Sequence, residues 1–377
     1  MRTAGTLKPL RYMTGPTGAV AQVEGQGEVV LLCSNNYLGL ANHPRVVQGA
    51  EDALRRYGAG PASVRFIAGT VAIHRQLEDR LAAWVGAEAA LSYVSCWNAN
   101  EGLLPTLTGE GDVIFSDALN HASIIDACRL TRAERVIYRH SDMADLETRL
   151  AQAGGERGRI IVTDGVFSME GDVARLPELV RLARRHDALL VVDDSHGIGV
   201  LGPSGRGLAE HFELLGEVDV ITGTLGKALS GAAGGFVAAS RTVVEYLIQR
   251  SRPQLFSNAL PPAVAGAALA ALEVLAAHPE LVGRLHENAS YMRSGLRRLG
   301  LSPLDGPSAI IPVIVGDTAR AMRWGEELYR RGVYVVGFGH PVVPEGQARL
   351  RVQVSAAHTR EHLDRALEAF ALLDRRG

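Results

Sequence analysis

The sequence predicts an α/β protein with a mostly parallel sheet flanked by helices and a second, smaller α/β domain. Three observations indicate this class. In the middle of the chain, short apolar runs rich in β-branched residues alternate with amphipathic helical stretches, which is the pattern of βαβ units. Polar clusters follow these runs directly, as ligand-binding residues follow the strands of parallel sheets. Near residue 261 the composition shifts to an alanine- and leucine-rich stretch, which indicates a second region.

Four strands are expected in the main sheet, namely residues 159–163, 188–194, 218–224 and 234–240. The first two are apolar, β-branched runs of the kind that is buried on both faces of a parallel sheet. Between them, residues 176–187 carry Pro177 at an early helical position and apolar residues at helical spacing, which predicts an amphipathic helix. The polar clusters after these runs therefore mark the expected site.

The C-terminal third predicts the smaller domain. Residues 261–289 are expected to form long helix that is interrupted near Pro279, and residues 318–332 a further helix. Three strands are expected at residues 309–316, 332–339 and within 348–359. We therefore divide the chain into an N-terminal arm (1–40), a large domain (41–270) and a small C-terminal domain (271–377).

Composition and charge exclude several classes of function. The formal net charge is −2, so no nucleic-acid partner is implied electrostatically. The three cysteines lie far apart without a CxxC pair, which argues against a disulfide framework and structural zinc, and no other metal motif is expected. No apolar run reaches the roughly 18 residues of a membrane span, and there is no signal-peptide pattern. The expected location is the cytoplasm.

One lysine, Lys227, lies among glycines, small residues and hydroxyls in the stretch GTLGKALSGAAGG, residues 223–235. A phosphate loop of the GxxxxGK[ST] type is excluded, because Ile221 stands where its first glycine belongs and Ala228 follows the lysine. A partly desolvated lysine at a strand end has a lowered pKa and attacks carbonyl groups. This setting favours a lysine that binds pyridoxal 5'-phosphate covalently, as a Schiff base.

That cofactor needs several groups around its lysine, and each has a candidate. Asp193, at the end of the strand 188–194, is placed to pair with the pyridine nitrogen. His196 is a candidate for the phenolic oxygen, Thr224 for the phosphate and His121 for stacking on the ring. Each residue alone has an ordinary structural explanation, such as a helix cap or a core histidine. Together, all at strand ends, they favour a cofactor site.

Several longer motifs resemble one family. The stretches that carry the resemblance are SNNYLGLANHP (34–44), ASVRFIAGT (62–70), SDALNHASI (116–124), TDGVFSMEG (163–171), VDDSHGIGVLG (192–202), GTLGKALSG (223–231) and RSRPQLFSNAL (250–260). They are similar to the α-oxoamine synthases, fold-type I pyridoxal-phosphate enzymes that join a small amino acid to an acyl-CoA. The resemblance runs from about residue 30 to the C-terminus and is strongest to the glycine C-acetyltransferase subgroup.

The resemblance implies roles for individual residues. The expected catalytic residues are Lys227, His121 and Asp193. The expected cofactor-binding residues are Ser95, Cys96, Trp97, His121, Ser168, Asp193, His196, Thr224, Lys227 and Ser257, with Ser257 reaching the phosphate of the neighbouring subunit. Asn35 and Arg351 are the expected pair for the substrate carboxylate, since a guanidinium offers a bidentate fork.

The resemblance also implies partners. The expected reaction condenses glycine or another small amino acid with an acyl-CoA, expected to be acetyl-CoA, within a homodimer whose active sites lie at the interface. Alternatives are a decarboxylating member such as an 8-amino-7-oxononanoate synthase, a promiscuous member, an aminotransferase, a β-eliminating lyase, or a non-catalytic protein that keeps the fold. Trp97 and Glu101 depart from the subgroup, which has a smaller aromatic residue and a glycine at these positions, and the acyl chain depends on that region.

Overall fold

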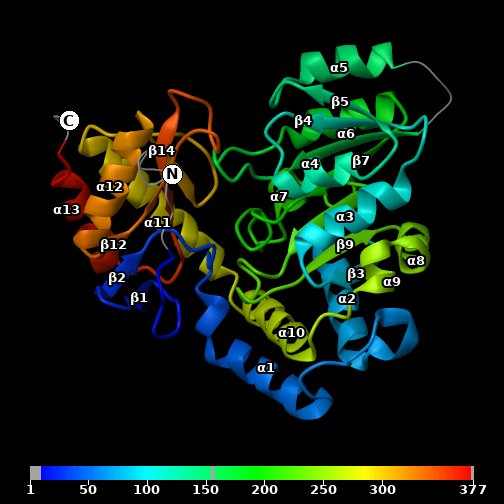
Figure 1. The fold of residues 1–377 in the computed structure, drawn as a ribbon, viewed down its shortest axis with the longest axis horizontal. Coiled ribbons are helices and arrows are strands. Elements are labelled where there is room, and N and C mark those ends of the chain that lie inside the picture. Colours follow the sequence, from blue (N-terminus) through cyan, green and yellow to red (C-terminus); the bar gives the residue numbers. More distant parts are fainter. Residues whose placement is uncertain (1–9, 154–157, 375–377) are drawn as a thin grey trace. The chain divides into compact units, whose positions relative to one another are not determined.

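The computed structural model describes residues 10–153 and 158–374, which fold as two compact units (Figure 1). The large unit contains residues 43–167 and 173–279. The small unit contains the described residues up to 42, residues 168–172 and the described residues from 280 onward. We describe each unit by itself.

A seven-stranded sheet forms the centre of the large unit. Its strands are β3 (Ala89–Tyr93), β4 (Val113–Asp117), β5 (Glu134–Tyr138), β6 (Arg159–Asp164), β7 (Ala188–Asp193), β8 (Val220–Thr224) and β9 (Gly235–Ala239). The order is β3-β9-β8-β7-β6-β4-β5. Strand β9 runs antiparallel to both of its neighbours, and all other neighbouring pairs are parallel. The predicted fold class, a mostly parallel sheet flanked by helices, is confirmed.

The helices of the large unit are α1 (Pro44–Tyr57), α2 (Ala72–Val85), α3 (Cys96–Leu107), α4 (Ala122–Arg129), α5 (Met143–Gln152), α6 (Leu176–Arg185), α7 (Leu208–His211), α8 (Arg241–Arg250), α9 (Arg252–Phe256) and α10 (Pro262–Ala277), with one π-helical turn, η2 (Arg65–Gly69). Leu103 of α3 and Ile124 of α4 are fully buried in one cluster with sheet residues such as Val191. This packing holds α3 and α4 against the sheet.

Two sheets and three long helices make up the small unit. One sheet has the order β1-β2-β12, with β1 (Val20–Val23), β2 (Gly27–Leu31) and β12 (Val333–Tyr334). The other has the order β10-β11-β14-β13 and is antiparallel, with β10 (Ser302–Pro303), β11 (Ile310–Gly316), β13 (Val336–Phe338) and β14 (Ala348–Gln353). The helices are α11 (Glu280–Arg298), α12 (Thr318–Arg330) and α13 (Arg360–Ala371), and a short 3-10 turn, η1 (Leu40–Asn42), follows the N-terminal strands.

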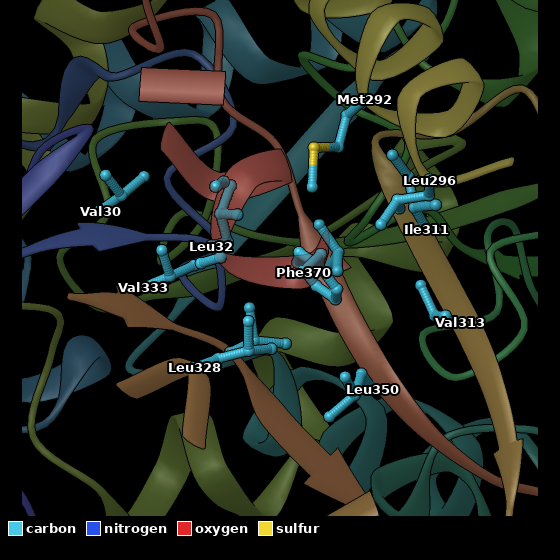
Figure 2. Packing of buried hydrophobic residues seen from close by; sticks show 14 of the residues in the cluster. Val30, Leu32, Met292, Leu296, Ile311, Val313, Leu328, Val333, Leu350 and Phe370 are labelled. Atoms are coloured by element: carbon cyan, nitrogen blue, oxygen red, sulfur yellow. The ribbon is translucent and has the colours of Figure 1, made fainter. Parts of the chain in front are cut away.

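The N-terminal segment belongs to the core of the small unit. Figure 2 shows Val30 and Leu32 among the buried residues that surround Phe370, and all three are 0% exposed. Strand β2 also pairs in parallel with β12, far along the chain. The sequence predicted residues 1–40 as an arm leading into the large domain and a boundary after residue 270. The compact units differ from this division in two ways. The N-terminal segment belongs to the small unit, because β2 pairs with a C-terminal strand, and the second boundary falls at residue 280.

His358 gives the small unit a pH-dependent stability. Its side chain is 3% exposed, and Nδ1 accepts a hydrogen bond of 2.9 Å from the Ser355 N–H. Burial lowers the pKa of His358 from 6.5 to about 4. The folded state therefore holds the neutral ring, and its advantage is complete above the unfolded pKa of about 6.5 and is lost as the pH falls toward 4.

We expect the free energy of unfolding of the small unit to fall by about 3 kcal/mol between pH 7 and pH 4 through His358 alone. The measurement is denaturant unfolding of the wild type and His358→Gln at several pH values. The variant is expected to be less stable at pH 7 but to lose less stability on acidification. Parallel pH curves for the two proteins would contradict this role.

Candidate active site

Lys227 lies in a loop that is closed on itself between β8 and β9. The Leu225 N–H and the Thr224 hydroxyl both donate to the Gly234 carbonyl oxygen, at 2.9 and 3.1 Å. The Gly226 N–H in turn donates to the Thr224 hydroxyl at 3.1 Å. Gly234 has φ +99°, a conformation that favours glycine. The loop therefore holds the half-buried Lys227 at the carboxyl end of β8, as the sequence predicts.

Asp193 ends the neighbouring strand β7 and is 4% exposed. Its Oδ2 accepts a hydrogen bond from Asn100 Nδ2 at 2.7 Å and from the Cys96 thiol at 3.6 Å. Its Oδ1 accepts from the Ser195 N–H at 3.0 Å. All three donors are neutral, so they fix the carboxylate in place without cancelling its charge. A buried carboxylate of this kind favours a cationic partner.

The start of α3 lies against the lysine loop. Ser95 caps the helix by accepting from the Asn98 N–H at 3.1 Å, which leaves the first N–H groups directed out of the helix end. A Cβ at Gly235, the first residue of β9, would come within 2.3 Å of the Cys96 nitrogen. Only glycine allows this approach. A helix start with free N–H groups is a favourable place for a phosphate.

His121 caps the start of α4. Its backbone N–H donates to Asp164 Oδ2 at 2.7 Å, and its ring Nδ1 lies 2.8 Å from the Ser123 hydroxyl. Burial lowers the pKa of the imidazole, so the ring is neutral at pH 7. The Trp97 ring lies edge-on to the His121 ring, with 6.0 Å between the centroids. These contacts hold the imidazole in one orientation at the strand ends.

Electrostatic interactions connect these groups with Lys227. Burial is the main cause that lowers the pKa of His121; the charge of Asp193 acts to raise it and that of Lys227 to lower it further. Burial and then the charge of Asp193 raise the pKa of the Cys96 thiol, and Lys227 opposes them. Burial also raises the pKa of Asp164, with Lys227 again opposing. The structure thus brings Lys227, Asp193, His121 and Cys96 together in the large unit.

Three other predicted cofactor residues, Thr224, His196 and Ser257, also lie in the large unit, each with different surroundings. Thr224 donates its hydroxyl proton within the lysine loop. His196 is 8% exposed and follows β7 closely in the chain. Ser257 ends α9 and lines a small cavity together with Arg65 and Asn98. The roles of these residues stay predictions.

Three further predicted residues lie in the small unit. Arg351 donates from Nη1 to the Ser168 carbonyl oxygen at 3.3 Å and from Nη2 to Gln353 Oε1 at 3.1 Å. Gln353 Nε2 donates to Asn35 Oδ1 at 2.6 Å, which links the two residues predicted to bind the substrate carboxylate. The Arg351 Nε is buried without a hydrogen-bond partner among the described residues. This guanidinium therefore retains a donor, as a carboxylate-binding arginine requires.

Sequence reasoning missed four residues that contact or accompany the predicted residues within each unit. Asn100 and Ser123 lie on α3 and α4 and bind Asp193 and His121, respectively, while Gln353 joins Asn35 and Arg351. Asp164 ends β6 and is the register partner of Asp193. The strand-end argument that selected Asp193 applies equally to Asp164. Nothing in the local sequence marks the other three, because their contacts depend on how the elements pack.

The residues present fit pyridoxal 5'-phosphate. A buried carboxylate that accepts from the neutral donors of Asn100, Cys96 and Ser195 suits a pyridinium nitrogen, and the glycine-lined helix start suits a phosphate. The chain contains two lysines, Lys8 and Lys227, and of the described residues Lys227 is the lysine in this setting. Among the described residues, no cluster of three or more His, Cys, Asp or Glu is arranged to hold a metal ion. In the same part of the chain, no single helix is long and apolar enough to cross a membrane.

Comparison with known proteins first defines the class. The family model described as aminotransferase class I and II matches residues 27–370, which is nearly the whole chain. The fold and the strand-end lysine agree with this class.

The relatives define the family more narrowly. The chain is 50% identical over 371 residues to a 2-amino-3-ketobutyrate coenzyme A ligase of Escherichia coli (strain K12), covering 98% of this chain and 93% of the relative. It is 49% identical over 374 residues to an 8-amino-7-oxononanoate synthase of Geobacter sulfurreducens, with 98% and 95% covered. A solved serine palmitoyltransferase variant from S. paucimobilis, with a bound PLP–myriocin aldimine, matches with a TM-score of 0.93 at 32% identity, with 98% and 94% covered.

The chain therefore belongs to the α-oxoamine synthase family of this class. The predicted family is confirmed. Two differently named relatives lie within one percentage point of identity, so identity alone does not select between their substrates.

Proposed function

We propose that this protein is a pyridoxal-phosphate-dependent C-acyltransferase that condenses glycine with acetyl-CoA to give 2-amino-3-oxobutanoate and free CoA. The cofactor is pyridoxal 5'-phosphate, the group named in the solved relative. The observation that carries the proposal is the convergence of three groups at the carboxyl edge of the sheet: Lys227 after β8, Asp193 with its neutral donors at the end of β7, and the oriented His121 after β4. The cytoplasmic location predicted from the sequence is part of the same proposal.

When bound, the cofactor supplies an aldehyde for amines and a ring that stabilises the electron pair left by a departing α-proton. Asp193 holds a proton on the ring nitrogen through its negative charge. Lys227 would hold the cofactor covalently until the amino group of the substrate takes its place, and the freed lysine amine would then accept the α-proton of the amino acid. Ser95 and the helix start of α3 bind the phosphate. Arg351 and Asn35 bind the substrate carboxylate, and His121 donates a hydrogen bond to the acyl carbonyl oxygen.

The preference for a short acyl group is supported by Trp97 and Glu101. The Trp97 indole N–H donates to Glu101 Oε1 at 2.7 Å, one helical turn away, so the two departures from the subgroup form one unit. This bond holds the bulky indole next to His121, and we propose that an indole there reduces the space for an acyl chain. The carboxylate of Glu101 also repels an acyl chain that ends in a carboxylate. Both effects favour acetyl-CoA over a long dicarboxylic acyl-CoA.

A homodimer with shared sites is part of the proposal. The turn η2 and the segment after α9 lie side by side, since Val64 forms a bridge with Asn258. Together they expose three large apolar side chains, Phe66 (62%), Ile67 (70%) and Phe256 (72%), and Ser257 follows directly. A group of exposed apolar residues is typical of an interaction surface. We propose that a second copy of the chain covers it and receives Ser257 at its phosphate site.

The test of the proposed function is a panel of acyl-CoAs and amino acids. Purified protein is incubated with acetyl-, butyryl-, palmitoyl- and pimeloyl-CoA, each with glycine, alanine or serine, and released CoA and products are measured by thiol assay and mass spectrometry. We expect CoA release to be fastest with glycine and acetyl-CoA and the product to keep its carboxylate. Fastest turnover of alanine with pimeloyl-CoA, with loss of carbon dioxide, would favour the 8-amino-7-oxononanoate reaction. Amino-group transfer without CoA release would reject the acyltransferase proposal.

The shared site predicts complementation in mixed dimers. We expect Ser257→Phe and Lys227→Ala chains each to be inactive alone, the first because the larger side chain obstructs the phosphate site. A dimer with one chain of each kind contains one site that has both Lys227 and, from the other chain, Ser257. CoA release should therefore return in the mixture, to about one active site per mixed dimer. An active Ser257→Phe protein, or no recovery on mixing, would contradict the shared site.

A further inference from the structure

A continuous chain of hydrogen bonds connects His121 with Asp193 inside the large unit. His121 Nδ1 lies 2.8 Å from the Ser123 hydroxyl, which lies 2.9 Å from Asn100 Nδ2. The same Nδ2 donates to Asp193 Oδ2 at 2.7 Å. Ser123 and Asn100 are each 2% exposed, so water does not compete with these bonds. These hydrogen bonds join the start of α4, a residue one turn into α3, and the end of β7.

The direction of every bond follows from the charge of Asp193. An ionised carboxylate only accepts hydrogen bonds, so Asn100 must present its amide NH₂ group to it. The second hydrogen of that group then points to the Ser123 oxygen, which accepts it. The Ser123 hydroxyl is left to donate its own proton to His121 Nδ1. The Ser123 backbone N–H donates to the same nitrogen at 3.2 Å.

His121 Nδ1 therefore receives two donors and carries no proton. We propose that Asn100 and Ser123 are positioning residues that hold His121 as the neutral tautomer with its proton on Nε2. Only the catalytic role of this tautomer rests on the proposed function, in which the Nε2–H of His121 donates a hydrogen bond to the acyl carbonyl oxygen. The tautomer itself depends on the hydrogen bonds alone.

The surroundings of His121 agree with a neutral ring. The charged groups that act on the imidazole are Asp193 and Lys227, which oppose each other, and Asp164 contacts its backbone N–H. Trp97 adds an uncharged ring at its edge. Protonation of Nδ1 would set its new N–H against the Ser123 backbone N–H, which points to the same nitrogen at 3.2 Å and cannot reverse. Such a clash of donors opposes the charged form of the ring.

The experiment uses full-length protein, as purified and after saturation with pyridoxal phosphate, labelled with ¹⁵N in the histidine rings. Long-range ¹H–¹⁵N NMR spectra distinguish a protonated from an unprotonated ring nitrogen, and His121→Gln assigns the His121 signals. We expect the Nε2–H tautomer in the wild type. In Ser123→Ala the His121 pKa should rise by roughly 0.5–1 unit, because Nδ1 loses one neutral donor. Ser123→Thr, which keeps the hydroxyl, should restore the wild-type pKa.

A second variant and a kinetic readout complete the test. Asn100→Leu should likewise raise the His121 pKa, since the Ser123 hydroxyl is no longer oriented. In the CoA-release assay, Ser123→Ala should lower kcat severalfold while the KM for the amino acid changes little. An Nδ1–H tautomer in the wild type, or an unchanged His121 pKa in both Ser123→Ala and Asn100→Leu, would overturn the inference. The expected NMR result without any CoA release would uphold the role of Asn100 and Ser123 in positioning His121, and it would reject the proposed function.

Discussion

Lys227→Ala is expected to lower the rate of CoA release by at least about 10⁴-fold, the largest effect of any single substitution in this protein. The substitution removes both the amine that binds the cofactor and the base that accepts the α-proton. The fold should survive, because the side chain is half-buried and the loop is closed by bonds of Thr224, Leu225 and Gly234 that do not involve the lysine.

The chain offers a matched control for this prediction. Lys8 is the only other lysine, so Lys8→Ala removes the same charge elsewhere in the sequence and should leave the rate unchanged. Lys227→Arg keeps the positive charge but lacks a nucleophilic amine, and it should be as inactive as Lys227→Ala. Steady-state CoA release and circular dichroism are measured for all three. Normal turnover in Lys227→Ala, with an unchanged circular dichroism spectrum, would contradict the assignment of the lysine.

Asp193→Asn is expected to have the second-largest effect, a loss of roughly 10³-fold in kcat, or about 4 kcal/mol in activation free energy. Asparagine has nearly the same shape, so packing against Asn100 and Ser195 is retained. It has no negative charge, so nothing holds a proton on the ring nitrogen and the electron pair from the amino acid is poorly stabilised. Loss of the charge should also shift the visible absorbance of the bound cofactor.

Asp219→Asn is the control for that experiment. Asp219 accepts a hydrogen bond from the Leu190 N–H at 2.7 Å, near the start of β7 rather than its end, and it is exposed. Its loss should leave kcat within about twofold of the wild type, since a surface substitution away from the site changes little. If Asp193→Asn and Asp219→Asn were equally active, Asp193 would not pair with the ring nitrogen.

Much of the large unit was predictable, because the residue pattern within each short segment is enough to indicate its strands and helices. The runs at 159–163 and 188–194 have apolar, β-branched centres and match β6 and β7 closely. Polar residues at their ends are confined to one edge of the sheet by parallel pairing. The expectation that Asp193 and Lys227 lie at the carboxyl edge of one sheet therefore follows from the sequence pattern, whereas the pairing of β7 with β8 comes from the structure.

The remainder depends on contacts between distant parts of the chain. Strand β2 pairs with β12, roughly 300 residues later, and local periodicity carries no sign of such a partner. Residues 168–172 join the small unit, where Ser308 Oγ donates to the Gly171 carbonyl oxygen at 2.7 Å. Asn100 and Ser123 meet only because α3 and α4 pack together. Their importance therefore becomes visible once the helices are placed.

The most direct test of this account is chemical trapping of the cofactor. Protein saturated with pyridoxal 5'-phosphate is reduced with borohydride, digested and mapped by mass spectrometry. We predict one pyridoxyl group per chain, on the peptide that contains Lys227, together with loss of the visible absorbance. Protein that takes up no cofactor, or carries the group only on Lys8 or the N-terminal amine, would contradict the central claim that Lys227 binds it covalently.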